Sequence, residues 1–233
     1  MNQAPFATIL GKLVIVYPDE IECPDCHRPK MDDHPDIVER LVGEGHERER
    51  VLSHQCECKA RAEKMAADML AASNLPNRGP EATPRTWDNF EGVDGATEAG
   101  NAAFAFARGA STETILALIG VAGSGKTHLV EAVGRWMLAK GQTVRYEYVS
   151  ELLDEWRDSY ALHSDAGADD IRDRLEAPRL LILDDLGQGK ATPWVQEKLT
   201  AIVDGRYRMG GTAWRLLVTT NLTRGEVAVQ LGE

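Results

Sequence analysis

Residues 120–127 have the sequence Gly-Val-Ala-Gly-Ser-Gly-Lys-Thr, which satisfies the spacing G-x-x-x-x-G-K-[ST]. An apolar run typical of a β-strand precedes this octapeptide, and a segment with helical periodicity follows it. The pattern requires this strand–loop–helix context. A chance glycine-rich turn is the alternative, and it would explain the spacing but not the context. The octapeptide therefore predicts a parallel α/β sheet in which a P-loop joins a strand to a helix.

The chemistry of this loop is that of a phosphate-binding site. Glycines allow backbone N–H groups to wrap around phosphates, and the N-terminus of the following helix presents the positive end of its dipole. We expect Lys126 to reach the β- and γ-phosphates of ATP and Thr127 to give its hydroxyl to Mg²⁺.

A second motif lies downstream, at residues 180–185, where the sequence is Leu-Leu-Ile-Leu-Asp-Asp. A hydrophobic strand that ends in two carboxylates is the form expected of a Walker B element. We expect Asp184 to anchor Mg²⁺ and Asp185 to orient or deprotonate the attacking water. The alternative is an aspartate pair that caps a turn before Gly187. The residues predicted to bind ATP or ADP are Gly120, Ala122, Gly123, Ser124, Gly125, Lys126, Thr127, His128 and Asp184.

Apolar β-type runs and helical patterns alternate from residue 87 onwards, which is typical of a parallel sheet covered by helices. Strands are predicted at 114–120, 143–149, 180–184 and 215–220, and a helix at 128–140. The fourth strand ends in Thr220 and Asn221, at the edge where open α/β sheets bind ligands. If it lies between the P-loop and Walker B strands, one of these residues contacts the γ-phosphate or its water. A turn-forming asparagine is the alternative. The predicted catalytic residues are Lys126, Asp185 and Asn221.

Length and composition predict the domain organisation. A chain of 233 residues accommodates one ordinary domain and a small appendage. Three prolines and a glycine within residues 74–86 predict a linker, which leaves 1–73 as an N-terminal domain and 87–233 as the core. The net charge of −11 argues against coating duplex DNA through overall charge. The apolar run 9–16 is far shorter than the ~20 residues that span a bilayer. We therefore expect a cytoplasmic protein without membrane contact.

All four cysteines lie in the N-terminal region. Cys23 and Cys26 form a C-x2-C knuckle, and Cys56 and Cys58 form a close pair before a helical run at 59–72. Four thiolates suit a tetrahedral zinc ion, and this layout resembles a treble-clef site. A redox dithiol, unmetallated thiols and a site with one histidine ligand are the alternatives. The candidate histidines are His27, His34, His46 and His54. The segment 36–52 is expected to be helical, with an apolar stripe that serves as core or partner surface.

Several motifs together resemble the AAA+ ATPases of the DnaC/IstB group. They are the extended P-loop Gly-Lys-Thr-His-Leu, the Walker B segment Leu-Asp-Asp-Leu-Gly, the segment Asp-Gly-Arg-Tyr at 204–207 and Thr-Thr-Asn-Leu at 219–222. The segment Trp-Asp-Asn-Phe at 87–90 resembles the group's lead-in, so the likeness covers roughly residues 86–233. This group comprises loaders of the replicative helicase and ATPase helpers of transposons. The resemblance implies homo-oligomeric rings or spirals that hold ATP between subunits and contact single-stranded DNA or a DnaB-like helicase.

The chain departs from the family pattern at its end. In the family, an arginine that completes a neighbour's site follows a Leu-Gly-Glu-Arg segment, and this sequence stops at Leu-Gly-Glu. The resemblance thus implies a C-terminally truncated AAA+ core that lacks this arginine, the last strand and the lid. Loss of such an arginine removes about 10³–10⁵ in rate, so we expect an ATPase with weak turnover. Arg206 and Arg208 are candidate substitutes, and a solvated basic helix end is the alternative.

The segment 150–176 is expected to be helical and contains Tyr160. Helicase loaders have extra helical structure at this place, close to single-stranded DNA, so the resemblance makes Tyr160 the candidate DNA contact. Stacking on a base is typically worth about 1–3 kcal/mol. Packing of Tyr160 against the core is the alternative. Three functions follow: a helicase loader, a transposition ATPase that acts with a transposase on duplex DNA, and a non-hydrolysing, nucleotide-dependent interaction module.

Overall fold

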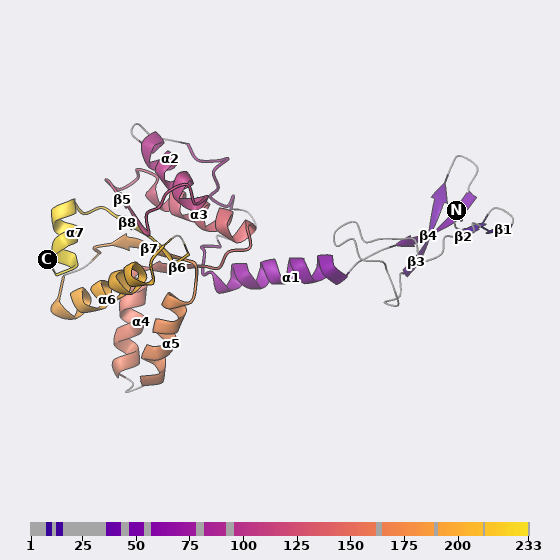
Figure 1. Ribbon diagram of the computed structural model, residues 1–233. Helices are drawn as coiled ribbons and strands as arrows, with labels where there is room; N and C mark the ends of the chain where they lie inside the picture. Colours follow the sequence, from indigo (N-terminus) through magenta and orange to yellow (C-terminus); the bar gives the residue numbers. More distant parts are fainter. Residues whose placement is uncertain are drawn as a thin grey trace. The chain divides into compact units, whose positions relative to one another are not determined.

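A computed structural model of the chain describes residues 8–10, 13–15, 36–42, 47–53, 57–77, 82–91, 96–161, 165–188, 191–211 and 213–232 (Figure 1). The chain divides into two compact units, Met1–Met65 and Ala66–Glu233. Among the described residues, no helix has the length and apolar character that a membrane span requires.

The smaller unit contains two antiparallel hairpins. Their strands are β1 (Thr8–Leu10) with β2 (Leu13–Ile15), and β3 (Asp36–Val42) with β4 (Glu47–Ser53). The helix predicted over 36–52 is therefore wrong. The pairing register sets Glu39 opposite Arg50 and Arg40 opposite Glu49. Helix α1 (Glu57–Ala72) follows, where the sequence predicts a helical run.

Four parallel strands form the sheet of the larger unit, in the order β5–β8–β7–β6. These are β5 (Ile115–Ile119), β6 (Val144–Tyr148), β7 (Leu180–Leu186) and β8 (Arg215–Thr220). All four predicted strands are confirmed, with ends that differ by at most two residues. Strand β8 lies between β5, which leads into the P-loop, and β7, which carries the Walker B aspartates. This is the strand order that contact of Thr220 or Asn221 with the γ-phosphate or its water requires.

Helices cover both faces of this sheet (Figure 1). They are α2 (Ala96–Ala107), α3 (Lys126–Ala139), α4 (Val149–Ala161), α5 (Asp165–Glu176), α6 (Pro193–Met209) and α7 (Arg224–Gln230). Leu180 and Ile182 of β7 pack with α2 and α3, whereas Leu181 and Leu183 pack with α4, α5 and α6. The alternation follows from the two-residue period of a strand buried on both faces. The predicted parallel sheet between helical layers is confirmed.

Between α1 and α2, residues 73–77 and 82–91 lie against the larger unit's core. We call these residues the arm. The carbonyl of Ser73 accepts a bond from the N–H of Tyr146 at 2.8 Å. Leu75 is 6% exposed, and a Cβ on Gly134 of α3 would lie 3.0 Å from its side chain. The absence of a side chain at Gly134 therefore makes room for Leu75, and the arm contacts both β6 and α3.

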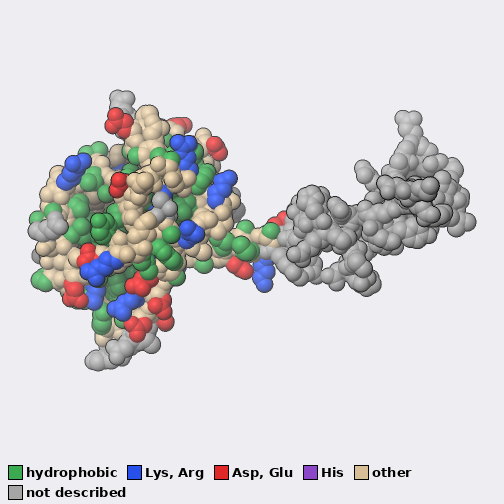
Figure 2. All heavy atoms as spheres, in the orientation of Figure 1, with side chains coloured by type: hydrophobic (Ala, Val, Ile, Leu, Met, Phe, Trp, Pro, Cys, Tyr) green, Lys and Arg blue, Asp and Glu red, His purple; other side chains and the backbone are tan. Residues whose placement is uncertain are grey.

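Charged side chains of both signs are interspersed over the face of the larger unit that Figure 2 shows. This face therefore presents no single field of positive charge.

Candidate nucleotide-binding site

The P-loop connects β5 to α3. Gly123 and Gly125 have φ angles of 79° and 86°, in the left-handed region that glycine adopts without strain. A Cβ on Gly125 would lie 2.9 Å from the ring of Phe90, so this glycine also lets the arm pack on the loop. Gly125 is the N-cap of α3 and makes no side-chain capping bond. The first N–H groups of α3 are thus available to an anion.

Lys126 lies at the mouth of this loop. Its Nζ donates to the carbonyls of Gly120 and Val121, each at 2.8 Å, and to Oδ1 of Asn221 at 2.8 Å. Burial lowers the pKa of Lys126, and the nearby carboxylates of Asp185 and Asp184 oppose this shift. The loop therefore holds an ammonium group beside the position expected for phosphate.

Asp184 is almost fully buried at the end of β7, with 1% of its surface exposed. Its Oδ2 accepts a 2.5 Å bond from the hydroxyl of Tyr146, and its Oδ1 accepts one from the hydroxyl of Thr219. Burial, together with the bond to Asp184, raises the pKa of Tyr146 well above its usual range, so this hydroxyl stays a donor. Tyr146 and Thr219 therefore fix the orientation of the carboxylate.

Thr127 and Asp184 are the residues that would hold Mg²⁺. Oγ1 of Thr127 lies 3.4 Å from Oδ1 of Asp184, which brings two hard oxygen donors together at the start of α3. Mg²⁺ is usually bound by one or two protein oxygens together with phosphate and water. Within the described part of the chain, no group of three or more His, Cys, Asp or Glu side chains could hold a metal. A bound Mg²⁺ would neutralise charge on the phosphates.

Asp185 has a φ of 60°, unusual for a residue other than glycine, and it lies in a register shift of the β7–β8 pairing. Backbone strain of this kind costs about 1–3 kcal/mol and is often found at functional sites. The N–H of Asp185 donates to Oγ1 of Thr219 at 2.9 Å. Nδ2 of Asn221 donates to Oδ1 of Asp185 at 3.2 Å, while the amide oxygen of Asn221 accepts from Lys126. Asn221 therefore bridges the cation and the carboxylate.

These side chains surround a cavity of about 520 Å³. It is lined by Arg85, Ala122, Gly123, Ser124, Gly125, Lys126, Thr127, His128, Tyr148, Asp185, Thr219 and Asn221. Two residues predicted to bind nucleotide do not line the cavity but contact residues that do. The carbonyl of Gly120 accepts a hydrogen bond from Lys126, and Asp184 contacts Thr127. Nε2 of His128 lies 2.8 Å from the carbonyl of Thr86, so its ring also contacts the arm. The structure thus brings the predicted nucleotide-binding and catalytic residues to one place.

A family comparison supports the same conclusion. Residues 48–233 match the model of a family described as IstB-like ATP binding protein. The chain belongs to this IstB-like ATP-binding family. An ATP-binding AAA+ core therefore underlies the geometry described above.

Two curated relatives of this IstB-like chain are uncharacterized proteins. YdaV of Escherichia coli (strain K12) is 33% identical over 120 residues, which are 52% of this chain and 46% of YdaV. YqaM of Bacillus subtilis (strain 168) is 29% identical over 195 residues, which are 75% of this chain and 56% of YqaM. The matches thus span about half the length of each relative. The crystal structure of the DnaC helicase loader matches with a TM-score of 0.54 and 24% identity, over 64% of this chain and 88% of that one, which shows a shared fold.

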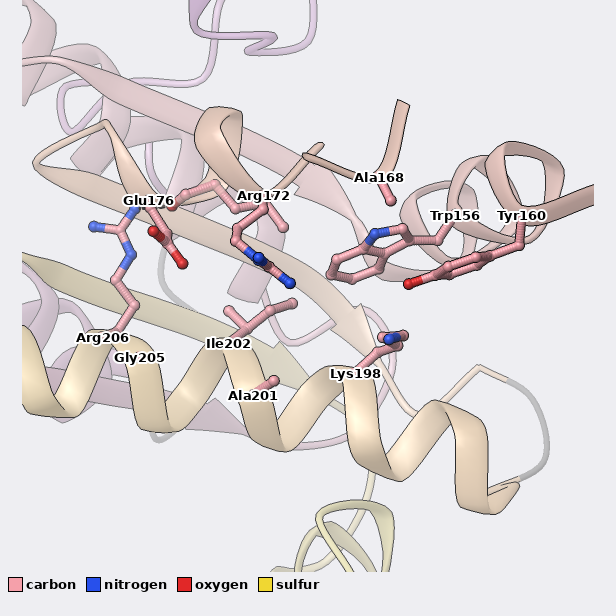
Figure 3. Close-up of a pocket in the computed structure, with 11 residues that line it drawn as sticks. Trp156, Tyr160, Ala168, Arg172, Glu176, Lys198, Ala201, Ile202, Gly205 and Arg206 are labelled. Atoms are coloured by element: carbon pink, nitrogen blue, oxygen red, sulfur yellow. Dashed lines mark hydrogen bonds between the residues drawn. The ribbon is translucent and has the colours of Figure 1, made fainter. Parts of the chain in front are cut away.

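Tyr160, the predicted DNA contact, lies near the end of α4 beside α6 (Figure 3). Its side chain is 45% exposed, and Nζ of Lys198 lies 5.2 Å from its ring centroid. The ring makes an edge contact with Trp194 at 6.5 Å, and the guanidinium of Arg157 lies 5.2 Å from the Trp194 ring. We call Arg157, Tyr160, Trp194 and Lys198 the aromatic platform. Its two rings and two cations have the composition of a surface that stacks bases, and contact with DNA stays a prediction.

Arg206 is not an arginine finger, and it is not a solvated helix end either. Only 2% of its surface is exposed. Nη1 donates to the carbonyl of Pro178 at 2.6 Å, and Nη2 donates to the carbonyl of Leu175 near the end of α5. Burial lowers its pKa to about 10, so it stays protonated at neutral pH. Arg208, in contrast, is 80% exposed and lies 3.6 Å from Asp204, as expected of a solvated helix end.

The predicted zinc ligands lie outside the described residues. This holds for Cys23, Cys26 and Cys56, and for the side chain of Cys58. The zinc site therefore stays a prediction from the sequence.

Sequence reasoning missed several residues of the site. Tyr148 lines the cavity, and Tyr146 and Thr219 orient Asp184. Tyr148 and Thr219 lie at or next to the carboxyl ends of parallel strands, so the rule that selected Asn221 also applies to them, whereas Tyr146 is the middle residue of β6. No local pattern indicates Arg85, because its partner Glu131 is 46 residues away.

Proposed function

We propose that this chain binds and hydrolyses Mg²⁺-ATP as part of an AAA+ homo-oligomer, and that its nucleotide state controls the loading of a DnaB-like replicative helicase onto single-stranded DNA. The line of hydrogen bonds from Lys126 through Asn221 to Asp185 carries the enzymatic part of this proposal. It joins a phosphate-binding cation to a carboxylate that is able to act on water.

In this mechanism, a water oxygen attacks the γ-phosphorus, and the bond from that phosphorus to the β–γ bridging oxygen breaks. Asp185 accepts the proton of the water. Asn221 orients the Asp185 carboxylate through its amide nitrogen and steadies Lys126 through its amide oxygen. Lys126 stabilises the negative charge that develops on the phosphates.

Two observations favour the helicase-loading role. The core has the fold of the DnaC helicase loader, and the aromatic platform lies on the helical layer formed by α4 and α6. Stacking on such a platform tolerates any base sequence, as a loader requires.

Replacing Tyr160 with alanine is expected to weaken binding of a labelled single-stranded oligonucleotide on the order of tenfold, because one stacked base is lost. Fluorescence anisotropy in the presence of ATP measures this. Tyr207→Ala is the matched control, since Tyr207 lies on α6 with 70% exposure and outside the aromatic platform. Equal affinities of Tyr160→Ala and the wild-type protein would exclude Tyr160 from the DNA site.

A transposition helper is the second candidate, and the IstB-like description of the matching family favours it. A pull-down of the chain with a replicative helicase and with a transposase, each with ATP, with ADP and without nucleotide, separates the two. We expect ATP-dependent capture of the helicase. Capture of the transposase alone, together with preference for duplex DNA, would replace the loader by the transposition helper.

We also propose that Cys23, Cys26, Cys56 and Cys58 bind one structural zinc ion. Metal analysis of the purified chain is expected to give one zinc per chain, and the double variant Cys23→Ser, Cys26→Ser is expected to lose it. Such a site typically contributes an apparent ~10–16 kcal/mol to the folding of a small module. ATP binding by the core should persist in this variant. A zinc content unchanged by both substitutions would contradict the proposed ligand set.

A further inference from the structure

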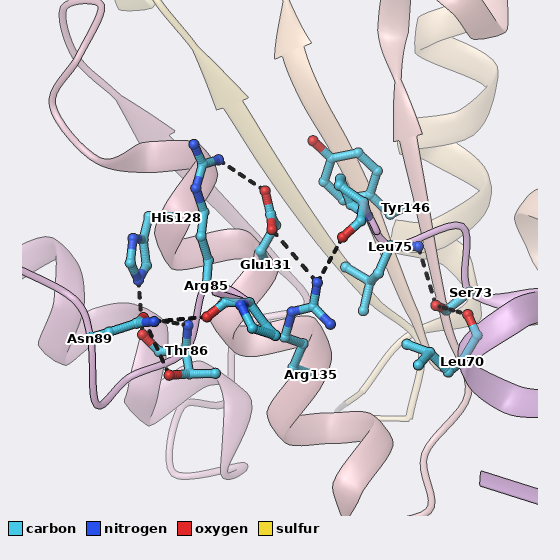
Figure 4. A network of polar contacts seen from close by, with 12 residues as sticks. Leu70, Ser73, Leu75, Arg85, Thr86, Asn89, His128, Glu131, Arg135 and Tyr146 are labelled. Atoms are coloured by element: carbon cyan, nitrogen blue, oxygen red, sulfur yellow. Dashed lines mark hydrogen bonds and ion pairs between the residues drawn. The ribbon is translucent and has the colours of Figure 1, made fainter. Parts of the chain in front are cut away.

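Arg85 belongs to the arm and lines the nucleotide cavity together with Thr127 and Asp185. Its side chain is 32% exposed, so the guanidinium is accessible from the cavity. Figure 4 shows it extending alongside α3 toward Glu131. The arm therefore adds a cation to a site whose other residues come from the P-loop and the sheet.

Glu131 sets the position of this cation. Nη1 of Arg85 lies 2.9 Å from Oε1 of Glu131, whose side chain is 1% exposed. Glu131 lies four residues after Thr127 on α3, and residues at this spacing share a helix face. The pair thus places the guanidinium on the same side of α3 as the hydroxyl expected to bind Mg²⁺. The ion pair with Glu131 uses one nitrogen of the Arg85 guanidinium, a group that carries five N–H donors.

The backbone on both sides of Arg85 is held by hydrogen bonds. The carbonyl of Thr86 contacts Nε2 of His128 at 2.8 Å, and the N–H of Thr86 donates to Oδ1 of Asn89 at 2.8 Å. Nδ2 of Asn89 donates to the carbonyl of Pro84, also at 2.8 Å. These contacts, which Figure 4 shows, fix the loop that carries Arg85 relative to the start of α3.

We propose that Arg85 contacts the γ-phosphate of bound ATP and so supplies, from within the same chain, a cation that distinguishes ATP from ADP. The inference rests on the proposed function, because it requires ATP in this cavity. Asp185 and Asp184 repel a γ-phosphate, and Lys126 is a single point charge, so a further protein cation beside Mg²⁺ strengthens the preference for ATP over ADP. A planar guanidinium suits this role because it binds two phosphate oxygens at once. Glu131 remains as its partner whenever the γ-phosphate is absent.

Nucleotide titrations of the full chain test this proposal. In Arg85→Gln, the affinity for ATP is expected to fall about tenfold or more, as for loss of a hydrogen bond to a charged group. The affinity for ADP should change by less than about threefold, because ADP lacks the phosphate that Arg85 contacts.

Two further variants separate this contact from a structural effect. Arg135→Gln also removes a cation from Glu131, at 3.9 Å, but Arg135 does not line the cavity, so both affinities should stay as in the wild type. The double variant Arg85→Gln, Glu131→Gln also removes the buried carboxylate that pairs with Arg85, so no unpaired charge is left behind. This variant should still lose the preference for ATP over ADP. Equal losses for ATP and ADP, or no loss, would overturn the inference while ATP binding by the wild-type chain stands. A wild-type chain that binds neither nucleotide would overturn the proposed function and this inference together.

Discussion

Asparagine in place of Asp185 is expected to lower the single-turnover rate of ATP hydrolysis by about 10²–10⁴-fold, the usual contribution of a general base. An amide cannot accept the proton of the attacking water. The backbone should not change, because asparagine tolerates the left-handed conformation that Asp185 adopts, with a φ of 60°. ATP affinity should therefore stay close to that of the wild-type chain. Rapid-quench measurements with protein in excess over ATP determine the rate even when turnover is slow.

Asp169→Asn is the matched control for this experiment. Asp169 lies on α5, is 71% exposed and pairs with Arg172 at 3.7 Å, so its substitution should leave the hydrolysis rate unchanged. Hydrolysis by Asp185→Asn at the wild-type rate would assign the base to another residue.

Leucine in place of Arg206 is expected to lower the free energy of unfolding by about 3 kcal/mol, since the carbonyls of Leu175 and Pro178 lose their donors and each unmet group costs about 1–3 kcal/mol. The loss should appear as a lower urea midpoint with an unchanged slope. ATP binding by the folded fraction should persist, because the cavity does not include Arg206.

Arg208→Leu provides the comparison, because Arg208 is two residues away on the same helix. Its exposed pair with Asp204 is worth about 0–1 kcal/mol, so the urea midpoint should move little. Equal destabilisation by the two substitutions would show that the buried bonds of Arg206 contribute nothing of their own.

Most of the sheet unit is predictable from the sequence, because its elements have strong local signals. The apolar run 180–184 and the glycine-rich loop before α3 each identify an element without any tertiary information. The hairpin of β3 and β4 is not predictable in this way, because its apolar residues also fit a helical stripe and strand pairing decides between the two. Three prolines and a glycine lie within residues 74–86, which cover part of the arm and the residues between its two parts, and this composition favours a linker. Its packing depends on distant partners such as Tyr146 and Gly134.

The same distinction applies to the site. The P-loop is one continuous segment and the two Walker B aspartates are adjacent in sequence, so each motif is recognisable by itself, and Asn221 follows directly after a predicted strand. The contact of Tyr146 with Asp184 depends on the pairing of β6 with β7, and that of Arg85 with Glu131 on the path of the arm. For Arg206, the position expected from the sequence was wrong. An arginine near a helix end favours a solvated position, and the placement of the carbonyls of Leu175 and Pro178 explains its burial.

The most direct test of the account is a titration of the full chain with ATP and Mg²⁺, compared with Lys126→Ala. The wild-type chain should bind saturably, and Lys126→Ala should bind at least about tenfold more weakly, because a charge-assisted contact to the phosphates is lost. The circular dichroism spectra of the two proteins should agree. Equal affinity of both proteins for ATP, or no binding by either, would contradict the assignment of this cavity as the nucleotide site.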